Sequence, residues 1–214
     1  HDAAALIDLL REHILQDVPV PDPLLDRLVE LAQDAPILAL ALDADAPCEA
    51  RMHAIDLLRQ LESAAPMVEY LRWQVERNQD DDLLDNALES LRCMGEPVRR
   101  PAKIAFLAAD DAGKEALLDV LCDFPGDDDV FQFAIRQFKA LPERRARYAG
   151  YLGKLDDDRA LEPLLDAAEE NGIAYIDFIE IRNAIERLGG EAPVRNFTDE
   201  PSYIDLQNRQ KHMQ

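Results

Sequence analysis

The strongest constraint on this chain is an apolar pattern with the period of an α-helix, which runs through nearly the whole sequence with only short breaks. In the first such stretch, Leu6, Leu9, Leu10 and Ile14 recur at the three- and four-residue spacing of one helix face. No stretch shows sustained alternation at period two, which a half-buried strand would require. We therefore predict an all-α fold of about 11–12 helices with no sheet.

Prolines and glycines lie where the helices are expected to begin and end. Asp22 before Pro23 combines an N-cap residue with proline at the first helical position, which is a start signal. Gly95, Gly126 and Gly172 suit the left-handed backbone that often ends a helix. The expected helical segments are about 2–16, the stretch from Pro23 past Leu31, a short one at 37–42, and then 47–62, 65–78, 80–94, 98–109, 112–123, 128–141, 143–154, 158–170 and 173–189.

The segment 128–141 is too apolar for a helix with a single buried stripe. Val130 and Phe138 lie on one line, while Phe131 and Ile135 extend the apolar surface to an adjoining side. A helix that is apolar over more than half its circumference is covered by neighbours on two sides. This is the condition of an inner helix in a stacked array.

Self-comparison finds three ordered matches between the middle and the last part of the chain. The Arg-Arg pair at 99–100, followed by Ala-Phe-Leu-Ala, recurs 45 residues later at 144–145, followed by Gly-Tyr-Leu-Gly. Two further matches, which begin at Glu115 and Ala134, recur at offsets of 47 and 50 residues. Ordered matches of this kind indicate copies of one helical unit, and weaker echoes occur earlier in the chain. The expected repeats are about 22–62, 65–95, 98–142 and 143–189, within a single domain over 1–190. From 190 onward the chain turns polar and irregular, and 191–214 is expected to be a tail.

Two segments of the last repeat carry a family resemblance. Residues 158–165 read Asp-Arg-Ala-Leu-Glu-Pro-Leu-Leu, and residues 181–189 end in Ala-Ile-Glu-Arg-Leu-Gly. A leucine-rich helix with proline near its start, followed by a helix that ends in an Ala-x-x-x-Leu-Gly pattern, resembles the bacterial HEAT-like repeat, and three-helix units resemble the armadillo variant. The resemblance implies an α–α superhelix, a right-handed solenoid, whose usual role is to bind another protein along its concave face. The resemblance implies no catalytic residues, so none is assigned to this chain.

The two ends of the chain are expected to cap this stack, because an end unit has a neighbour on one side only. The main apolar groups of the tail are Phe197, Tyr203, Ile204 and Leu206. They either fold back onto the last helix or leave the tail free to act as a docking peptide. Both alternatives fit the sequence.

The chain carries 44 acidic and 23 basic side chains, which gives a formal charge of −21. Such a charge repels polyphosphate and anionic membrane surfaces, so we expect neither a nucleic-acid nor a membrane partner. No apolar run approaches the length of a membrane span. The acidity indicates a solubility surface or, alternatively, a face that captures a basic protein.

The cysteines number three, Cys48, Cys93 and Cys122, and they are widely spaced with no Cys-x-x-Cys pair. An odd, scattered set is not a disulfide framework. We therefore expect small buried residues in a reducing compartment, and a cytoplasmic protein.

Three aspartate triplets, 80–82, 127–129 and 156–158, each precede a predicted helix. In the structural interpretation, one carboxylate of each triplet accepts hydrogen bonds from the first turn and the others favour the positive end of the helix. In the functional alternative, the triplets form a row that binds a cation or a basic partner. The glycine spacing of a calcium loop is absent.

Two sets of side chains are candidate contacts for a partner protein. In one alternative, a local basic cluster forms ion pairs between repeats, and in the other it captures an acidic segment of a partner. Two aromatic residues pack between repeats or, alternatively, anchor a partner. The candidate protein-binding residues are Arg99, Arg100, Arg136, Lys139, Arg144, Arg145 and Arg147 from the basic cluster, and Tyr70 and Trp73.

No catalytic constellation is recognisable in the sequence. The four histidines are scattered without cysteines at ligand spacing, and there is no phosphate-binding loop or nucleophile elbow. We expect no catalytic residues, no metal and no cofactor. The leading hypothesis is a non-enzymatic scaffold or adaptor that binds another protein along its concave face. The alternatives are an acidic inhibitor or immunity-type protein that neutralises a basic target and, third, a HEAT-like lyase or glycosylase-type enzyme.

Overall fold

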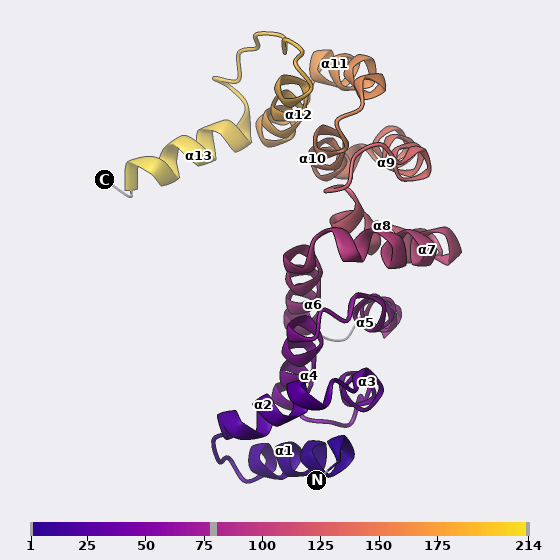
Figure 1. Cartoon of the computed structure of the whole chain (residues 1–214). Helices are drawn as coiled ribbons and strands as arrows, with labels where there is room; N and C mark the ends of the chain where they lie inside the picture. The colour runs from indigo at the N-terminus through magenta and orange to yellow at the C-terminus, as the bar shows by residue number, and fades with distance from the viewer. Residues whose placement is uncertain (1, 78–80, 213–214) are drawn as a thin grey trace. The chain divides into compact units, whose positions relative to one another are not determined.

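The computed structural model describes residues 2–77 and 81–212, and within them all regular structure is helical (Figure 1). These residues form thirteen α-helices and three short 3-10 helices, with no strand. The predicted all-α class is therefore confirmed. The chain divides into two compact units, His1–Leu121 and Cys122–Gln214, which are described separately below. The expected single domain over 1–190 stays a prediction.

The helices of the first unit are joined by short connections. They are α1 (Ala3–Leu15), α2 (Asp22–Leu31), α3 (Asp34–Ala41), α4 (Cys48–Gln60), α5 (Ala64–Arg77), α6 (Asp81–Met94), η1 (Glu96–Val98), α7 (Arg99–Ala108) and α8 (Asp111–Leu121). Each α-helix with described burial contributes an apolar face to a shared core, in which Leu58, Met67 and Leu71 are fully buried. Contacts run mainly between helices close in sequence, such as α3 with α4 and α5 with α6.

A buried arginine ties three helices of this unit together. The Nε of Arg51 donates to the carbonyl oxygen of Ala41 at the end of α3, over 3.0 Å. Its Nη2 donates to Oε1 of Gln74 on α5, also over 3.0 Å. Since the last carbonyls of a helix have no intrahelical donor, Arg51 satisfies one of them inside the core.

The second unit contains the remaining helices. They are α9 (Asp128–Ala140), η2 (Pro142–Arg144), α10 (Arg145–Leu155), η3 (Asp158–Ala160), α11 (Leu161–Glu169), α12 (Tyr175–Arg187) and α13 (Pro201–His212). Helix α10 packs most extensively on α12 and also contacts α9. A Cβ atom placed on Gly153 would lie only 3.0 Å from the Cα of Ala184, so glycine permits this close approach. Phe131 and Ile135 of α9 are both buried, as the broad apolar surface of that segment predicts.

Ion pairs join the helix starts within the second unit. Arg159 bonds Asp128 over 2.8 Å and Asp157 over 2.7 Å, and its guanidinium lies 4.3 Å from the ring centroid of Phe131. Arg195 donates to the carbonyl oxygens of Ala168 and Glu170, at the end of α11. Arg195, which follows α12 in the chain, therefore caps the end of α11 and holds the segment after α12 against the second unit.

The expectation that the chain is irregular after Gly190 is wrong for 201–212, which form α13. The Glu200 carboxylate accepts from the Tyr203 backbone N–H over 2.9 Å at the start of this helix. Hydrogen bonds from Ser202, Tyr203 and Tyr175 lower the pKa of Glu200. Proline at position 201 also suits the first turn of a helix, where its missing N–H costs no intrahelical bond.

The aromatic residues of this terminal segment pack on α12. The ring of Phe197 lies 5.3 Å from that of Tyr175 and 4.9 Å from that of Phe178, centroid to centroid. The ring of Tyr203 lies 4.9 Å from that of Tyr175. The terminal segment therefore folds back onto the last long helix, while Ile204 remains 43% exposed.

Candidate protein-binding groove between α5 and α7

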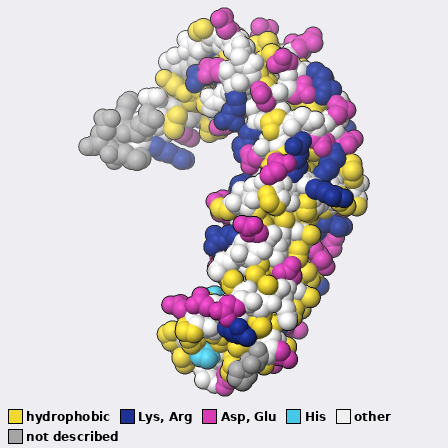
Figure 2. Space-filling view, viewed as in Figure 1, with side chains coloured by type: hydrophobic (Ala, Val, Ile, Leu, Met, Phe, Trp, Pro, Cys, Tyr) yellow, Lys and Arg dark blue, Asp and Glu magenta, His cyan; other side chains and the backbone are white. Residues whose placement is uncertain are grey.

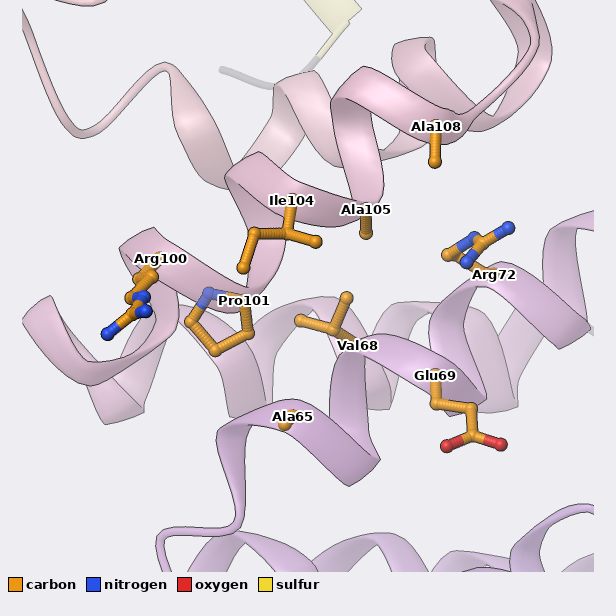
Figure 3. Close-up of a pocket in the computed structure, with 9 residues that line it drawn as sticks. All are labelled: Ala65, Val68, Glu69, Arg72, Arg100, Pro101, Ile104, Ala105 and Ala108. Carbon is orange, nitrogen blue, oxygen red and sulfur yellow. The ribbon is translucent and has the colours of Figure 1, made fainter.

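An apolar groove of about 600 Å³ lies between α5 and α7 of the first unit. Figure 3 shows Val68 of α5 facing Pro101 and Ile104 of α7 across the groove. Ile104 is 61% exposed, although it is a large apolar residue on an otherwise acidic protein. The complete lining is Ala65, Val68, Glu69, Arg72, Arg100, Pro101, Ile104, Ala105 and Ala108.

The sequence of the two helices explains why they leave this space between them. Each has a proline at its third position, Pro66 in α5 and Pro101 in α7, where the first-turn N–H groups have no intrahelical acceptor. The groove is then lined largely by short side chains, including Ala105 and Ala108. Methyl groups cannot fill the distance between two helices as leucine would, so the depression between them stays open.

A second hollow of about 420 Å³ continues the first one. The two hollows share Arg72 and Ala108. The second is lined further by Val75 and Glu76 of α5 and by the residues at the α7–α8 junction, among them Asp110. Together the two hollows form a surface that follows α5 and α7 along most of their lengths.

The charged side chains at this surface are not used up by contacts within the protein. Among the described residues, neither Arg72 nor Arg100 forms an ion pair, and the same holds for Glu69 and Glu76. Other basic residues are paired, as Lys154 is with Asp123 over 2.8 Å. The groove therefore combines an exposed apolar strip with charges of both signs that are available to a ligand.

The structure places two predicted arginines of the first unit at the start of α7. Arg100 lines the groove. Its neighbour Arg99 instead lies 3.5 Å from Glu96, one turn earlier. Of the seven basic residues singled out from sequence, Arg100 is thus the one that belongs to this site.

The two predicted aromatic residues lie on another side of α5. Tyr70 is fully buried, as the packing alternative expects, and its hydroxyl lies 3.3 Å from Oε1 of Gln74. The partly exposed Trp73 ring has the guanidinium of Arg77 4.4 Å from its centroid and that of Arg51 5.1 Å away. Trp73, not Tyr70, keeps surface that a partner could reach.

The other five predicted basic residues belong to the second unit and do not form one site there. Arg145 pairs with Glu170 over 2.5 Å, and Nε of Arg147 donates to the Tyr151 hydroxyl over 2.7 Å. Arg144 is exposed at the start of α10. Arg136 and Lys139 line a shallow hollow on α9 beside Ile135.

The aspartate triplets serve helix starts where the structure describes them. The Asp127 carboxylate accepts from the Val130 N–H over 3.2 Å, and that of Asp157 accepts from the Arg159 N–H over 3.0 Å. The structural interpretation is therefore confirmed for these two triplets. In the triplet 80–82, residue 80 and the side chain of Asp81 lie outside the described part of the chain.

Sequence reasoning did not identify most of the groove. Of the groove lining, the sequence singled out Arg100 but not Arg72, Pro101 or Ile104. The usable signal was Ile104, an apolar residue outside the buried line that Ala102 and Phe106 form on α7. Which residues lie opposite it could not be read from spacing, because α5 and α7 are separated by a whole helix.

One titratable group outside the groove is perturbed by burial. Burial raises the pKa of Asp177, and the nearby Arg145 guanidinium opposes this rise. Both line a cavity of about 260 Å³ beside the loop at Gly172. Asp177 has neither a nucleophile nor a second free acid in that lining to form a catalytic pair.

The cysteine expectation is wrong for two of the three residues. Cys48 and Cys93 are exposed, and only Cys122 is buried. Cys48 is the first residue of α4. Cys93 lies on the exposed face of α6, two residues after the buried Leu91. Periodicity alone did not separate these positions from the core.

Neither a metal site nor a membrane span is found among the described residues. Within them, no group of three or more histidine, cysteine, aspartate or glutamate side chains could hold a metal ion. No helix in the same residues has the length and apolar character to cross a membrane. On the face shown in Figure 2, acidic and basic side chains are interspersed.

Comparison with known proteins finds no match: no family model, no curated protein and no solved structure is similar to this chain. The groove is the candidate functional site, because exposed apolar surface coincides there with charged side chains that form no ion pair among the described residues.

Proposed function

We propose that this protein is a non-enzymatic protein-binding module and that the groove between α5 and α7 is its docking site. The observation that carries the proposal is the exposed Ile104 in an apolar groove flanked by Arg72 and Arg100, which form no ion pair with any described residue. An apolar strip with a charged rim is the usual anatomy of a protein interface. The groove is open and shallow-sided, unlike the deep pocket that encloses a small substrate.

The proposal includes the repeat architecture that the sequence suggests. Pro66 and Pro101 occupy equivalent positions in α5 and α7, as expected for corresponding helices of successive repeats. Stacked helical repeats present continuous surfaces between neighbouring units, and partners commonly bind there. A scaffold or adaptor role, with no reaction of its own, is consistent with such a surface.

The test is quantitative affinity capture of partners from the native cell with three forms of the chain. Wild type is compared with Ile104→Glu and with the matched control Ile176→Glu, which changes an isoleucine of similar exposure, 57% against 61%. We expect Ile104→Glu to lose the captured partner at least about tenfold and Ile176→Glu to keep it, because a charge in an apolar contact is costly. Equal capture by all three forms would refute the groove as the docking site.

A second candidate, neutralisation of a basic target, is favoured by the charge of the first unit. Residues 1–121 carry 25 acidic and 11 basic side chains, a net of 11 − 25 = −14. Long-range attraction of this kind is screened by salt over about 8 Å at physiological ionic strength. Capture repeated at low and high salt distinguishes the two functions: a partner lost in high salt but indifferent to Ile104→Glu supports the inhibitor function.

A further inference from the structure

The groove between α5 and α7 has two chemically different ends. The first hollow runs from Ala65 and Arg100, at the beginnings of both helices, to Arg72 and Ala108. The second hollow continues from Arg72 and Ala108 to Glu76 and Asp110, at and just beyond the last turns of the two helices. The two helices therefore run in the same direction along the groove. We call these the arginine end (Ala65, Arg100, Pro101) and the acidic end (Val75, Glu76, Asp110).

Backbone dipoles add to the side-chain charges at each end. The N-termini of α5 and α7 place partial positive charge at the arginine end, together with the Arg100 guanidinium. Their C-termini place partial negative charge at the acidic end, together with the Glu76 carboxylate. The Asp110 carboxylate contributes less, because it accepts from the Gly113 N–H at the start of α8 over 2.9 Å. Arg72 lines both hollows and Glu69 lies between Ala65 and Arg72, so neither side chain distinguishes the two ends. The dipoles, Arg100 and Glu76 thus give a bound segment an electrostatic gradient along the groove.

The length of the groove suits a short helix. From Ala65 to Glu76 the lining spans twelve residues of α5, and the eleven rises between them correspond to about 16 Å or three helical turns at 1.5 Å per residue. The buried Val68 and Ala105 form the floor of the groove and the exposed Ile104 stands at its edge, so the groove accepts one ridge of larger side chains from a neighbour. Ridges spaced by three and four residues are what an amphipathic helix presents.

We propose that the occupant is an amphipathic α-helix of a partner protein, about three turns long, that binds antiparallel to α5 and α7. This inference rests on the proposed function. The positive N-terminal end of the partner helix, with a Lys or Arg side chain, lies against Glu76 at the acidic end. Its C-terminal end carries a carboxylate that pairs with Arg100. Apolar side chains at i, i+4 and i+7 fill the groove between Val68 and Ile104.

The test is selection of helical peptides of about 14 residues, the length that spans the groove with one spare turn, from a displayed library. The library is randomised along one apolar ridge and in the first and last turns, and the full chain serves as bait. The selected peptides are expected to carry Lys or Arg in the first turn and Asp or Glu in the last, and to gain helical ellipticity on binding. Ile104→Glu should weaken them at least about tenfold.

A charge swap tests the orientation. Arg100→Glu should raise the Kd of a selected peptide about fivefold. A peptide whose last-turn carboxylate is replaced by Lys should regain that affinity when it binds the Arg100→Glu protein, but not when it binds wild type. Arg99→Glu is the matched control, since Arg99 neighbours the groove without lining it and contacts Glu96. It should leave the Kd within about twofold.

The outcomes separate this inference from the proposed function. The antiparallel helix would be overturned by selected peptides with the opposite charge order, by non-helical peptides or by the selection of no peptide at all. In each of these cases, capture that still depends on Ile104 would keep the groove as the docking site. A dimer of the chain that sedimentation detects and Ile104→Glu dissolves would make a second copy the occupant, which also overturns the inference. Capture and peptide binding that both ignore Ile104→Glu would overturn the inference and the proposed function together.

Discussion

Two glycines one helical turn apart in α10 should respond to alanine in opposite ways. Gly150 and Gly153 lie on the same helix, and neither has the positive φ that favours glycine. Around a Cβ built on Gly150 there is no atom within 4 Å. A Cβ on Gly153 would lie 3.0 Å from the Cα and 3.2 Å from the Cβ of Ala184 on α12.

The expected free energies follow from two contributions. Alanine gains about 0.5–1 kcal/mol over glycine inside a helix at either position, because its unfolded backbone has less freedom to lose. At 153 this gain is opposed by overpacking, which costs about 1–3 kcal/mol when a backbone atom must move. Helix propensity cancels in the comparison of the two variants. Gly150→Ala should therefore be more stable than Gly153→Ala by about 1–3 kcal/mol.

Urea unfolding followed by far-UV circular dichroism measures this difference. The midpoint for Gly150→Ala should lie above that of wild type, and that for Gly153→Ala should lie well below that of Gly150→Ala with an unchanged m-value. Equal midpoints for the two variants would refute the claim that α10 and α12 touch at Gly153. A Gly153→Ala protein more stable than Gly150→Ala would refute it outright.

Three other perturbations have expected outcomes. Arg51→Ala leaves the buried Ala41 carbonyl without its donor and the Gln74 amide oxygen with only the Tyr70 hydroxyl, so it should cost about 2–4 kcal/mol of unfolding free energy. Unfolding followed by fluorescence of the single tryptophan measures this, and a loss under about 0.5 kcal/mol would contradict the role of Arg51. Because the pKa of Glu200 is lowered, the stability that its carboxylate contributes is present above its ordinary pKa of 4.5 and is lost as pH falls through the lower folded pKa. The ring NMR signals of the tyrosines beside it should therefore shift below pH 4.5 in wild type. The same titration in a Glu200→Gln protein would assign it to another group. In the native protein, a thiol reagent should modify Cys48 and Cys93 quickly and Cys122 only after unfolding; rapid reaction of all three would contradict the burial of Cys122.

The helix starts show where sequence reasoning worked. Asp127 and Asp157 were assigned as capping residues, and their carboxylates accept N–H groups two or three residues later. The interaction is complete within one turn, so its participants are all visible in a short stretch of sequence. The N-cap expected at Asp22 is off by one residue, since Asp22 is the first residue of α2 and Pro21 precedes it.

The terminal helix α13 shows where local reasoning failed. Its sequence has a weak apolar pattern, which predicts an irregular tail. The helix forms where the Glu200 carboxylate accepts N–H groups from its own first turn and from Tyr175, and where Tyr203 packs on Tyr175. These partners are separated by more than twenty residues in the chain, so no window of the sequence contains the reason for the helix.

The sequence alone determined that the chain is helical, where most helices begin and end, and which faces are apolar, because periodicity, caps and helix-breaking residues act within a few residues. The tertiary structure decided which exposed apolar residue matters. Ile104 faces Val68 and Arg72 only because α5 and α7 pack as neighbours with a complete helix between them in the chain. A binding groove is a relation between distant segments, and the free energy that brings them together comes from burial of their other faces.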